Sequence, residues 1–175
     1  MSEPHMPPSS LVELLHLIEA AGINVWLDGG WGVDALLGTQ IRPHRDVDLI
    51  LQVADVPTLE SILLSRGYRV REGSPPDSFV LADAMGHEVD VHAVNFDDDG
   101  NGHYLMQNGE TWIFPAEGFS GHGAVDGKAV QCLSPATQVL CHAHGYVPTE
   151  KDVRDMAALQ GRFSVKLPRH LRDGS

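Results

Sequence analysis

Residues 26–51 read WLDGGWGVDALLGTQIRPHRDVDLIL, the most informative stretch of the sequence. An apolar run ends at Asp28-Gly29-Gly30, a segment of helical character follows, and Asp46-Val47-Asp48 opens a second apolar run. Residues i and i+2 of a strand point to the same face. Asp46 and Asp48 are therefore predicted to project together at the start of a strand, a short way after a glycine turn.

A third acid lies in HEVDVHAV, residues 87–94, which read as a strand with Asp90 and His92 on one face. If this strand neighbours the first, about 4.8 Å away, three carboxylates converge. Two unit charges 4 Å apart repel by roughly 4 kcal/mol at an effective dielectric of 20. Either one acid takes up a proton or a cation lies among them. Because Mg²⁺ prefers carboxylates, with waters and substrate phosphates as further ligands, the metal ligands predicted are Asp46, Asp48 and Asp90.

The glycine pair indicates phosphate binding. Glycine lets a ligand approach its backbone N–H groups, and the start of the following helix adds a partial positive charge. Basic side chains just before the acid pair could add charge near the same pocket. The nucleotide-binding residues predicted on these grounds are Gly29, Gly30, Arg42, His44 and Arg45. Each motif alone is more often structural, so the prediction depends on their occurring together in this order.

The composition fits one domain, residues 1–175, with enough apolar residues, 42%, for a core. Within it we expect a loose lead-in (1–8), a C-terminal helical part (134–162) and a tail (164–175). The net charge of −12 argues against a general nucleic-acid surface, and no apolar run reaches the roughly 18 residues of a membrane span, so neither partner is expected. Two cysteines without a CxxC pattern favour the cytoplasm.

The order of elements is helix, strand, helix, strand, helix, several strands and then helices. This order predicts an α+β fold with a mixed β-sheet flanked by helices and followed by C-terminal helices. Residues 103–132 are weakly patterned, with short strands expected around Trp112 and Val130. The elements expected elsewhere are helices at 10–21, 32–37, 56–66, 134–143 and 150–160, and strands at 25–27, 47–53, 68–71, 79–82 and 87–94.

The motif order G-G-W-G-x-D, H-R-D-x-D and D-x-H resembles the DNA polymerase β-like nucleotidyltransferases, and within them the small antibiotic nucleotidyltransferases of the lincosamide type. Many members of the wider superfamily carry Gly-Ser where this chain has Gly29-Gly30, whereas the glycine pair is typical of the antibiotic-modifying branch. The matching pieces are WLDGGWGVDALLG (26–38), RPHRDVDL (42–49), EVDVHAVNFDDDG (88–100) and GYVPTEKDVRDMAAL (145–159).

The resemblance implies a nucleotidyltransferase fold and transfer of AMP from ATP, or of a nucleotide from another NTP, to a hydroxyl of a small antibiotic, most closely a lincosamide. Two Mg²⁺ ions would be held by Asp46 and Asp48. Asp90 would be a third metal ligand or the catalytic general base, alternatives that sequence leaves open. Lys151 would reach the triphosphate. His92 shares the face of Asp90, which places it to touch the acceptor.

Other interpretations stay open at this point. The acceptor could be an aminoglycoside, a protein or an RNA end, and a non-catalytic nucleotide- or drug-binding module is an alternative of another class. A histidine-based transition-metal site fits less well, because the ten histidines are scattered. A second copy of so small a chain could close its drug pocket as a homodimer. Aromatic residues that could contact the acceptor, but that are more often core, are Trp31, Tyr104, Trp112 and Phe114.

Overall fold

The computed structural model describes residues 3–144 and 146–172. Residues 1–2 of the expected lead-in, Gly145 and residues 173–175 of the expected tail lie outside the described residues. The helices are α1 (Pro8–Ala20), α2 (Gly29–Leu37), α3 (Val56–Ser65), α4 (Pro135–Ala143), α5 (Glu150–Phe163) and α6 (Arg169–Arg172), with 3₁₀ turns η1 (Val53–Asp55) and η2 (Ala116–Ser120). The strands are β1 (Trp26–Asp28), β2 (Asp46–Gln52), β3 (Arg69–Ser74), β4 (Ser78–Ala82), β5 (Glu88–Phe96), β6 (Gly102–Leu105), β7 (Thr111–Phe114), β8 (Gly121–Val125) and β9 (Lys128–Cys132).

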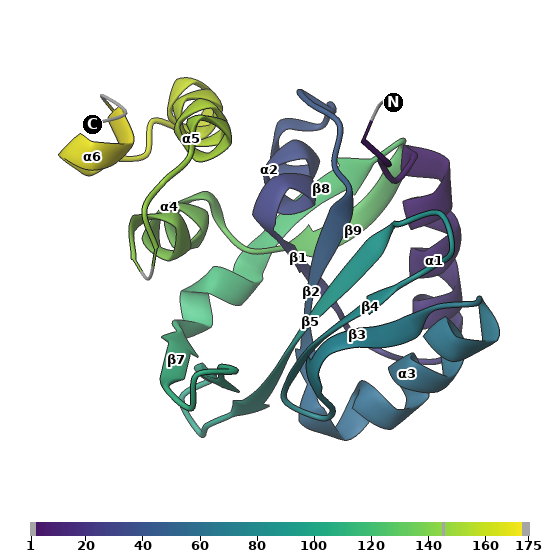
Figure 1. The fold of residues 1–175 in the computed structure, drawn as a ribbon. Helices are drawn as coiled ribbons and strands as arrows, with labels where there is room; N and C mark the ends of the chain where they lie inside the picture. Colours follow the sequence, from purple (N-terminus) through teal and green to yellow (C-terminus); the bar gives the residue numbers. More distant parts are fainter. Residues whose placement is uncertain (1–2, 145, 173–175) are drawn as a thin grey trace.

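The described strands form one mixed sheet in the order β3-β4-β5-β2-β1-β9-β8, and the β6–β7 hairpin extends from β5 (Figure 1). Strand β2 lies at the centre, antiparallel to β1 and parallel to β5. The register sets Asp48 opposite Asp28 of β1 and opposite Asp90 of β5. The sheet therefore carries three aspartates in one row across three neighbouring strands.

The two faces of the central strands differ because alternate side chains point to opposite faces. Val47, Leu49 and Leu51 of β2 are completely buried in the main core, whose other members include the apolar side chains of α1 and α3. The acids lie on the opposite face, followed along β2 by Ile50. A second, smaller core there joins Ile50 to the β6–β7 hairpin. The sheet thus has one packed face and one that is partly open.

Helix α2 begins where β1 ends, with the carboxylate of Asp28 as its N-cap. It ends at Gly38, whose backbone is left-handed (φ 72°). Helices α4 and α5 pack against α2, so the C-terminal helices stand beside the acid row (Figure 1). The α5 helix begins with a capping box between Thr149 and Asp152.

The fold class predicted from the sequence is confirmed, and most element positions agree to within a few residues. In the weakly patterned region 103–132, the strands expected around Trp112 and Val130 are confirmed as β7 and β9. The region holds more structure than expected, since β6 and β8 also lie in or overlap it. The termini also contain buried side chains: Met6 in the lead-in, and Leu167 and Leu171 in the segment expected to be a tail. None of the helices in the described ranges combines the length and the apolar character needed to cross a bilayer.

Candidate active site

The acid row is the centre of the candidate site. Donor atoms of Asp48, Asp90 and His92 all lie within 4.8 Å of one another, the group in the described residues that could hold a metal ion. Asp46 lies on the same face of β2 as Asp48 and lines the same cleft, but it is exposed and stands outside this group. The structure thus brings two of the three predicted metal ligands together and adds a histidine.

The ring of His92 lies against both carboxylates. Its Nε2 is 3.1 Å from Asp90 Oδ1 and 3.5 Å from Asp48 Oδ1. Burial raises the pKa of Asp48 to about 6, with the charges of Asp46 and Asp90 adding to the rise and His92 opposing it. Burial acts to lower the pKa of His92, but the two carboxylates outweigh it and hold that pKa well above its ordinary value. The imidazolium therefore offsets the repulsion between the acids.

The donor set fits a divalent cation. Asp48 and Asp90 supply the carboxylate oxygens that Mg²⁺ prefers. The Nε2 of His92 is buried and makes no well-aligned hydrogen bond to any described residue. A positively charged ring between two carboxylates indicates a position that suits a cation. One histidine belongs to this group.

The glycine pair lies inside the first turn of α2 rather than before it. Gly29 has φ 58°, and a Cβ on it would lie 2.2 Å from Asp48 Oδ2, so glycine lets this carboxylate reach the start of the helix. The Gly29 N–H already donates to Asp28 Oδ1 at 2.7 Å. The backbone donor left for a phosphate at this position is therefore the N–H of Gly30 rather than that of Gly29.

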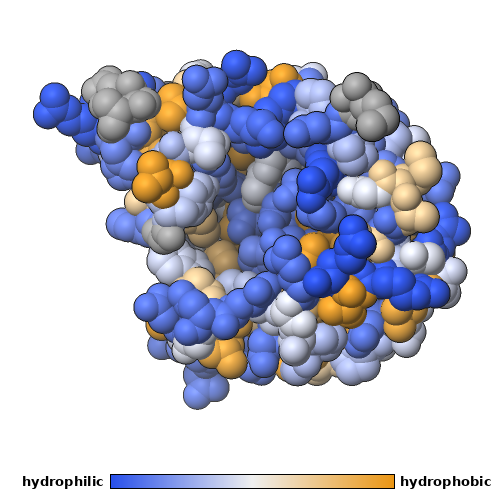
Figure 2. Space-filling model, in the orientation of Figure 1, coloured by the Kyte–Doolittle hydropathy of each residue, from blue (hydrophilic) through white to orange (hydrophobic). Residues whose placement is uncertain are grey.

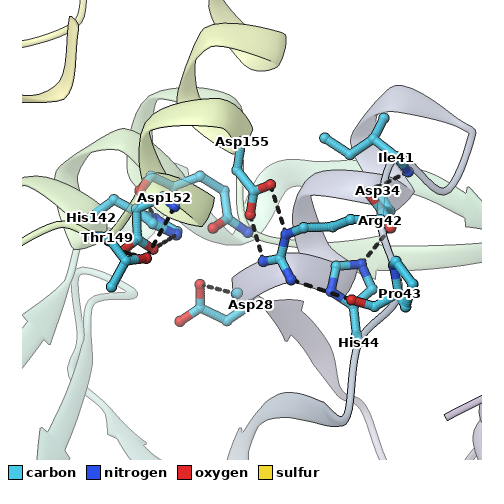
Figure 3. Close-up of polar contacts among 12 residues, drawn as sticks. Asp28, Asp34, Ile41, Arg42, Pro43, His44, His142, Thr149, Asp152 and Asp155 are labelled. Atoms are coloured by element: carbon cyan, nitrogen blue, oxygen red, sulfur yellow. Dashed lines mark hydrogen bonds and ion pairs between the residues drawn. The ribbon is translucent and has the colours of Figure 1, made fainter. Parts of the chain in front are cut away.

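The three basic residues before the acid pair have different surroundings. Arg42 lines the cleft, and both oxygens of Asp155 in α5 accept hydrogen bonds from its guanidinium, at 3.0 and 2.7 Å (Figure 3). His44 is buried, with Nε2 2.5 Å from Asp34 Oδ2. Arg45 pairs with Glu88 at the surface. The structure brings Arg42 to the cleft and places His44 beneath Gly30, whereas neither His44 nor Arg45 lines the cleft wall.

A cleft of about 640 Å³ lies between the C-terminal helices and the β6–β7 hairpin (Figure 2). Asp28, Asp46 and Asp48 line it, whereas Asp90 is not among the lining residues but contacts His92, which is. Lys151, in the first turn of α5, lines one side, and its contact with a triphosphate stays a prediction. Tyr104, Trp112 and Phe114 form an aromatic wall on the hairpin, and the Tyr104 ring stacks on His92 with centroids 5.0 Å apart. The fourth aromatic candidate, Trp31, is buried in the core. The cleft therefore has a charged end and an aromatic side.

Residues that the sequence did not indicate complete the site. Asp155 binds Arg42 from 113 positions away in the chain, and Asp28 caps α2 beside the acids. Tyr146 and Asp152 also line the cleft and are joined by a hydrogen bond of 3.1 Å. One signal could have indicated Asp155: it lies four residues after Lys151, on the same side of the helix.

Comparisons with known proteins agree with this geometry. The model of the aminoglycoside-2″-adenylyltransferase family matches residues 10–159. A lincosamide resistance protein of Staphylococcus haemolyticus is 32% identical over 160 residues, which cover 91% of this chain and 98% of the relative. A 2″-aminoglycoside nucleotidyltransferase of Escherichia coli is 40% identical, but over only 65 residues, 35% of this chain and 37% of that protein.

Solved structures show the same fold. The lincomycin-bound crystal structure of the lincosamide antibiotic adenylyltransferase LnuA superimposes with a TM-score of 0.78 at 30% identity, covering 89% of this chain and 98% of that one. The structure of ANT(2″)-Ia with adenylyl-2″-tobramycin gives a TM-score of 0.70 at 20% identity, covering 89% and 88%. At that identity the second likeness is one of fold alone.

Proposed function

The chain belongs to the aminoglycoside-2″-adenylyltransferase family and is a nucleotidyltransferase, and we propose that it transfers AMP from ATP to a hydroxyl of a lincosamide antibiotic, releasing pyrophosphate. The observation that carries the proposal is the row Asp28-Asp48-Asp90, whose first two members line a cleft with a charged end and an aromatic side. Such a cleft can hold a nucleotide triphosphate and an amphipathic acceptor side by side.

In this proposal Asp46 and Asp48 hold two Mg²⁺ ions. When bound, Mg²⁺ supplies charge neutralisation for the phosphate oxygens. The chain's own donors to the triphosphate are the N–H of Gly30 with the positive end of α2, the guanidinium of Arg42 and the ammonium of Lys151. These groups fix the orientation of the α-phosphate beside the acids.

Asp90 acts as the general base. It accepts the proton of the acceptor hydroxyl while the hydroxyl oxygen attacks the α-phosphorus. The P–O bond to the β-phosphate breaks, and its electron pair leaves with pyrophosphate. A positioned base of this kind contributes roughly 10²–10⁴-fold to the rate. His92, stacked on Tyr104 and in contact with Asp90, is placed to contact the acceptor near that hydroxyl.

A lincosamide is preferred over an aminoglycoside because the likeness to the lincosamide resistance protein spans 98% of that protein, whereas the aminoglycoside relative matches over 37% of its length. The family description keeps the aminoglycoside as the second candidate. We also propose a cytoplasmic enzyme, since ATP is its donor and its two cysteines are unpaired. We further propose that the chain forms a homodimer that covers the exposed Tyr146 and Val147 near the cleft. Light scattering, which measures the mass of the particle in solution, tests this.

Pyrophosphate release measured with Mg–ATP and lincomycin, clindamycin or tobramycin tests the proposal. We expect release with the two lincosamides, lost in the Asp48→Asn variant although that variant keeps its circular dichroism spectrum. Release with tobramycin alone would move the acceptor to the aminoglycosides. Tight ATP binding without release on any acceptor would contradict the proposed reaction and return the non-catalytic module to consideration.

A further inference from the structure

The ion pair between Arg42 and Asp155 joins two distant parts of the chain. Asp155 lies on α5 with a side chain 1% exposed, and both of its oxygens accept from Arg42, Nε to Oδ1 at 3.0 Å and Nη2 to Oδ2 at 2.7 Å. This is the parallel two-bond arrangement that matches a guanidinium to a carboxylate and fixes its orientation as well as its position. Figure 3 shows the two side chains directed toward one another above Asp28.

The pairing leaves part of the guanidinium free for another ligand. Arginine has five N–H donors, and the bonds to Asp155 take one on Nε and one on Nη2. Nη1 makes a long contact of 3.5 Å to the carbonyl of Pro43. The Nη2 group lies 2.8 Å from where a Cβ of Gly30 would be, directly over the first turn of α2. The remaining donors are therefore held beside the helix end that would receive a phosphate.

Stability alone gives a weak reason for this pair. Taking two charges out of water costs nearly as much as their attraction returns, so buried ion pairs often contribute little to net stability. A buried acid that binds a cleft arginine does, however, restrict a long and flexible side chain to one orientation. Restricting it before the ligand arrives removes part of the entropic cost of binding.

We propose that Asp155 is a positioning residue that holds Arg42 over the start of α2 to bind the polyphosphate of the nucleotide. Lys151 is one helical turn earlier on α5 and lines the same cleft, so a single helix sets the position of both cations. The inference depends on the proposed function in one respect only, that the ligand of this end of the cleft is a nucleotide polyphosphate. In space, Asp48 lies next to Gly29, Arg42 lies next to Gly30, and Asp155 holds Arg42 from the far side.

The test measures binding of Mg–ATP, of Mg–tripolyphosphate and of AMP to the full chain by titration calorimetry. Asp155→Asn keeps the size of the buried side chain, and Arg42→Lys keeps the charge but cannot form the two-bond pair. We expect each to weaken ATP and tripolyphosphate binding by about tenfold and AMP binding by less than about twofold. The double variant should bind no more weakly than Arg42→Lys alone, because both changes remove the same arrangement.

The matched control is Glu13→Gln, which breaks the exposed pair of Glu13 with Arg66, an arginine–carboxylate pair outside the residues that line the cleft. It should leave every affinity unchanged. A lowered melting temperature for Asp155→Asn with unchanged ATP affinity, or wild-type ATP affinity in Arg42→Lys, would overturn the inference. If the variants show the expected affinities for ATP, tripolyphosphate and AMP but the wild type transfers AMP to no antibiotic, the inference about Asp155 is supported. Only the proposed function is then contradicted.

Discussion

Replacing Gly29 by alanine tests the contact between the start of α2 and the acid row. The new Cβ would lie 2.2 Å from Asp48 Oδ2, whereas ordinary contact begins near 3.4 Å, so the carboxylate must move by about 1.2 Å. A displacement of about 1 Å at a reacting centre costs on the order of 100-fold in rate. Alanine at φ 58° also costs roughly 1–2 kcal/mol, which lowers the melting temperature of a chain this size by about 2–8 °C.

Gly38→Ala is the matched control at the other end of the same helix. Gly38 has φ 72°, but a Cβ there would meet nothing within 4 Å. It should therefore lower the melting temperature by a similar amount and leave activity near that of the wild type. Steady-state rates of pyrophosphate release and thermal melts of both variants give the comparison. If Gly29→Ala kept more than about a third of the wild-type kcat/KM, or if Gly38→Ala lost as much activity as Gly29→Ala, the reasoning would be refuted.

Three further outcomes follow from the site. The affinity for Mg²⁺ or Mn²⁺, measured by calorimetry from pH 5 to 8, should fall about tenfold for each pH unit below about 6. Burial raises the pKa of Asp48 to about 6 from its ordinary 3.8, and a metal needs the carboxylate ionised. A flat profile between pH 5 and 7 would contradict this. Chelation with EDTA should abolish activity, and added Mg²⁺ should restore it. The melting temperature should stay nearly unchanged, because His92 lies between the acids without a metal. A chelated protein that unfolds or stays active would contradict this prediction. Trp112→Ala should raise KM for lincomycin by about tenfold and leave KM for ATP unchanged, since Trp112 belongs to the aromatic wall. Equal changes in both KM values would argue against binding of the acceptor at this wall.

The pairs of polar side chains within β2 and within β5 could be predicted because their geometry is local. A strand places every second side chain on one face, so Asp46 with Asp48 and Asp90 with His92 follow from spacing alone. Pairing of the two strands was the step that sequence could not supply, since α3, β3 and β4 lie between them in the chain. The register that sets Asp48 beside Asp90 comes from the sheet as a whole.

Contacts distant in sequence were beyond prediction. The sequence shows that Arg42, His44 and Arg45 precede the acids, but the partner of each decides its direction, and these partners are Asp155, Asp34 and Glu88. The strands expected around Trp112 and Val130 are β7 and β9, whereas β6 and β8 were missed for another reason. These two strands are short and contain glycine and partly exposed residues, so the alternation that marks a half-buried strand is weak.

The proposed transfer of AMP is tested most directly by the mass of lincomycin after incubation with Mg–ATP and either the wild-type chain or its Asp90→Asn variant. We expect a lincomycin product heavier by one AMP with the wild type, and a yield lower by at least about 100-fold with Asp90→Asn, whose amide cannot accept the hydroxyl proton. Unmodified lincomycin with the active wild-type protein, or equal yields from both proteins, would contradict it.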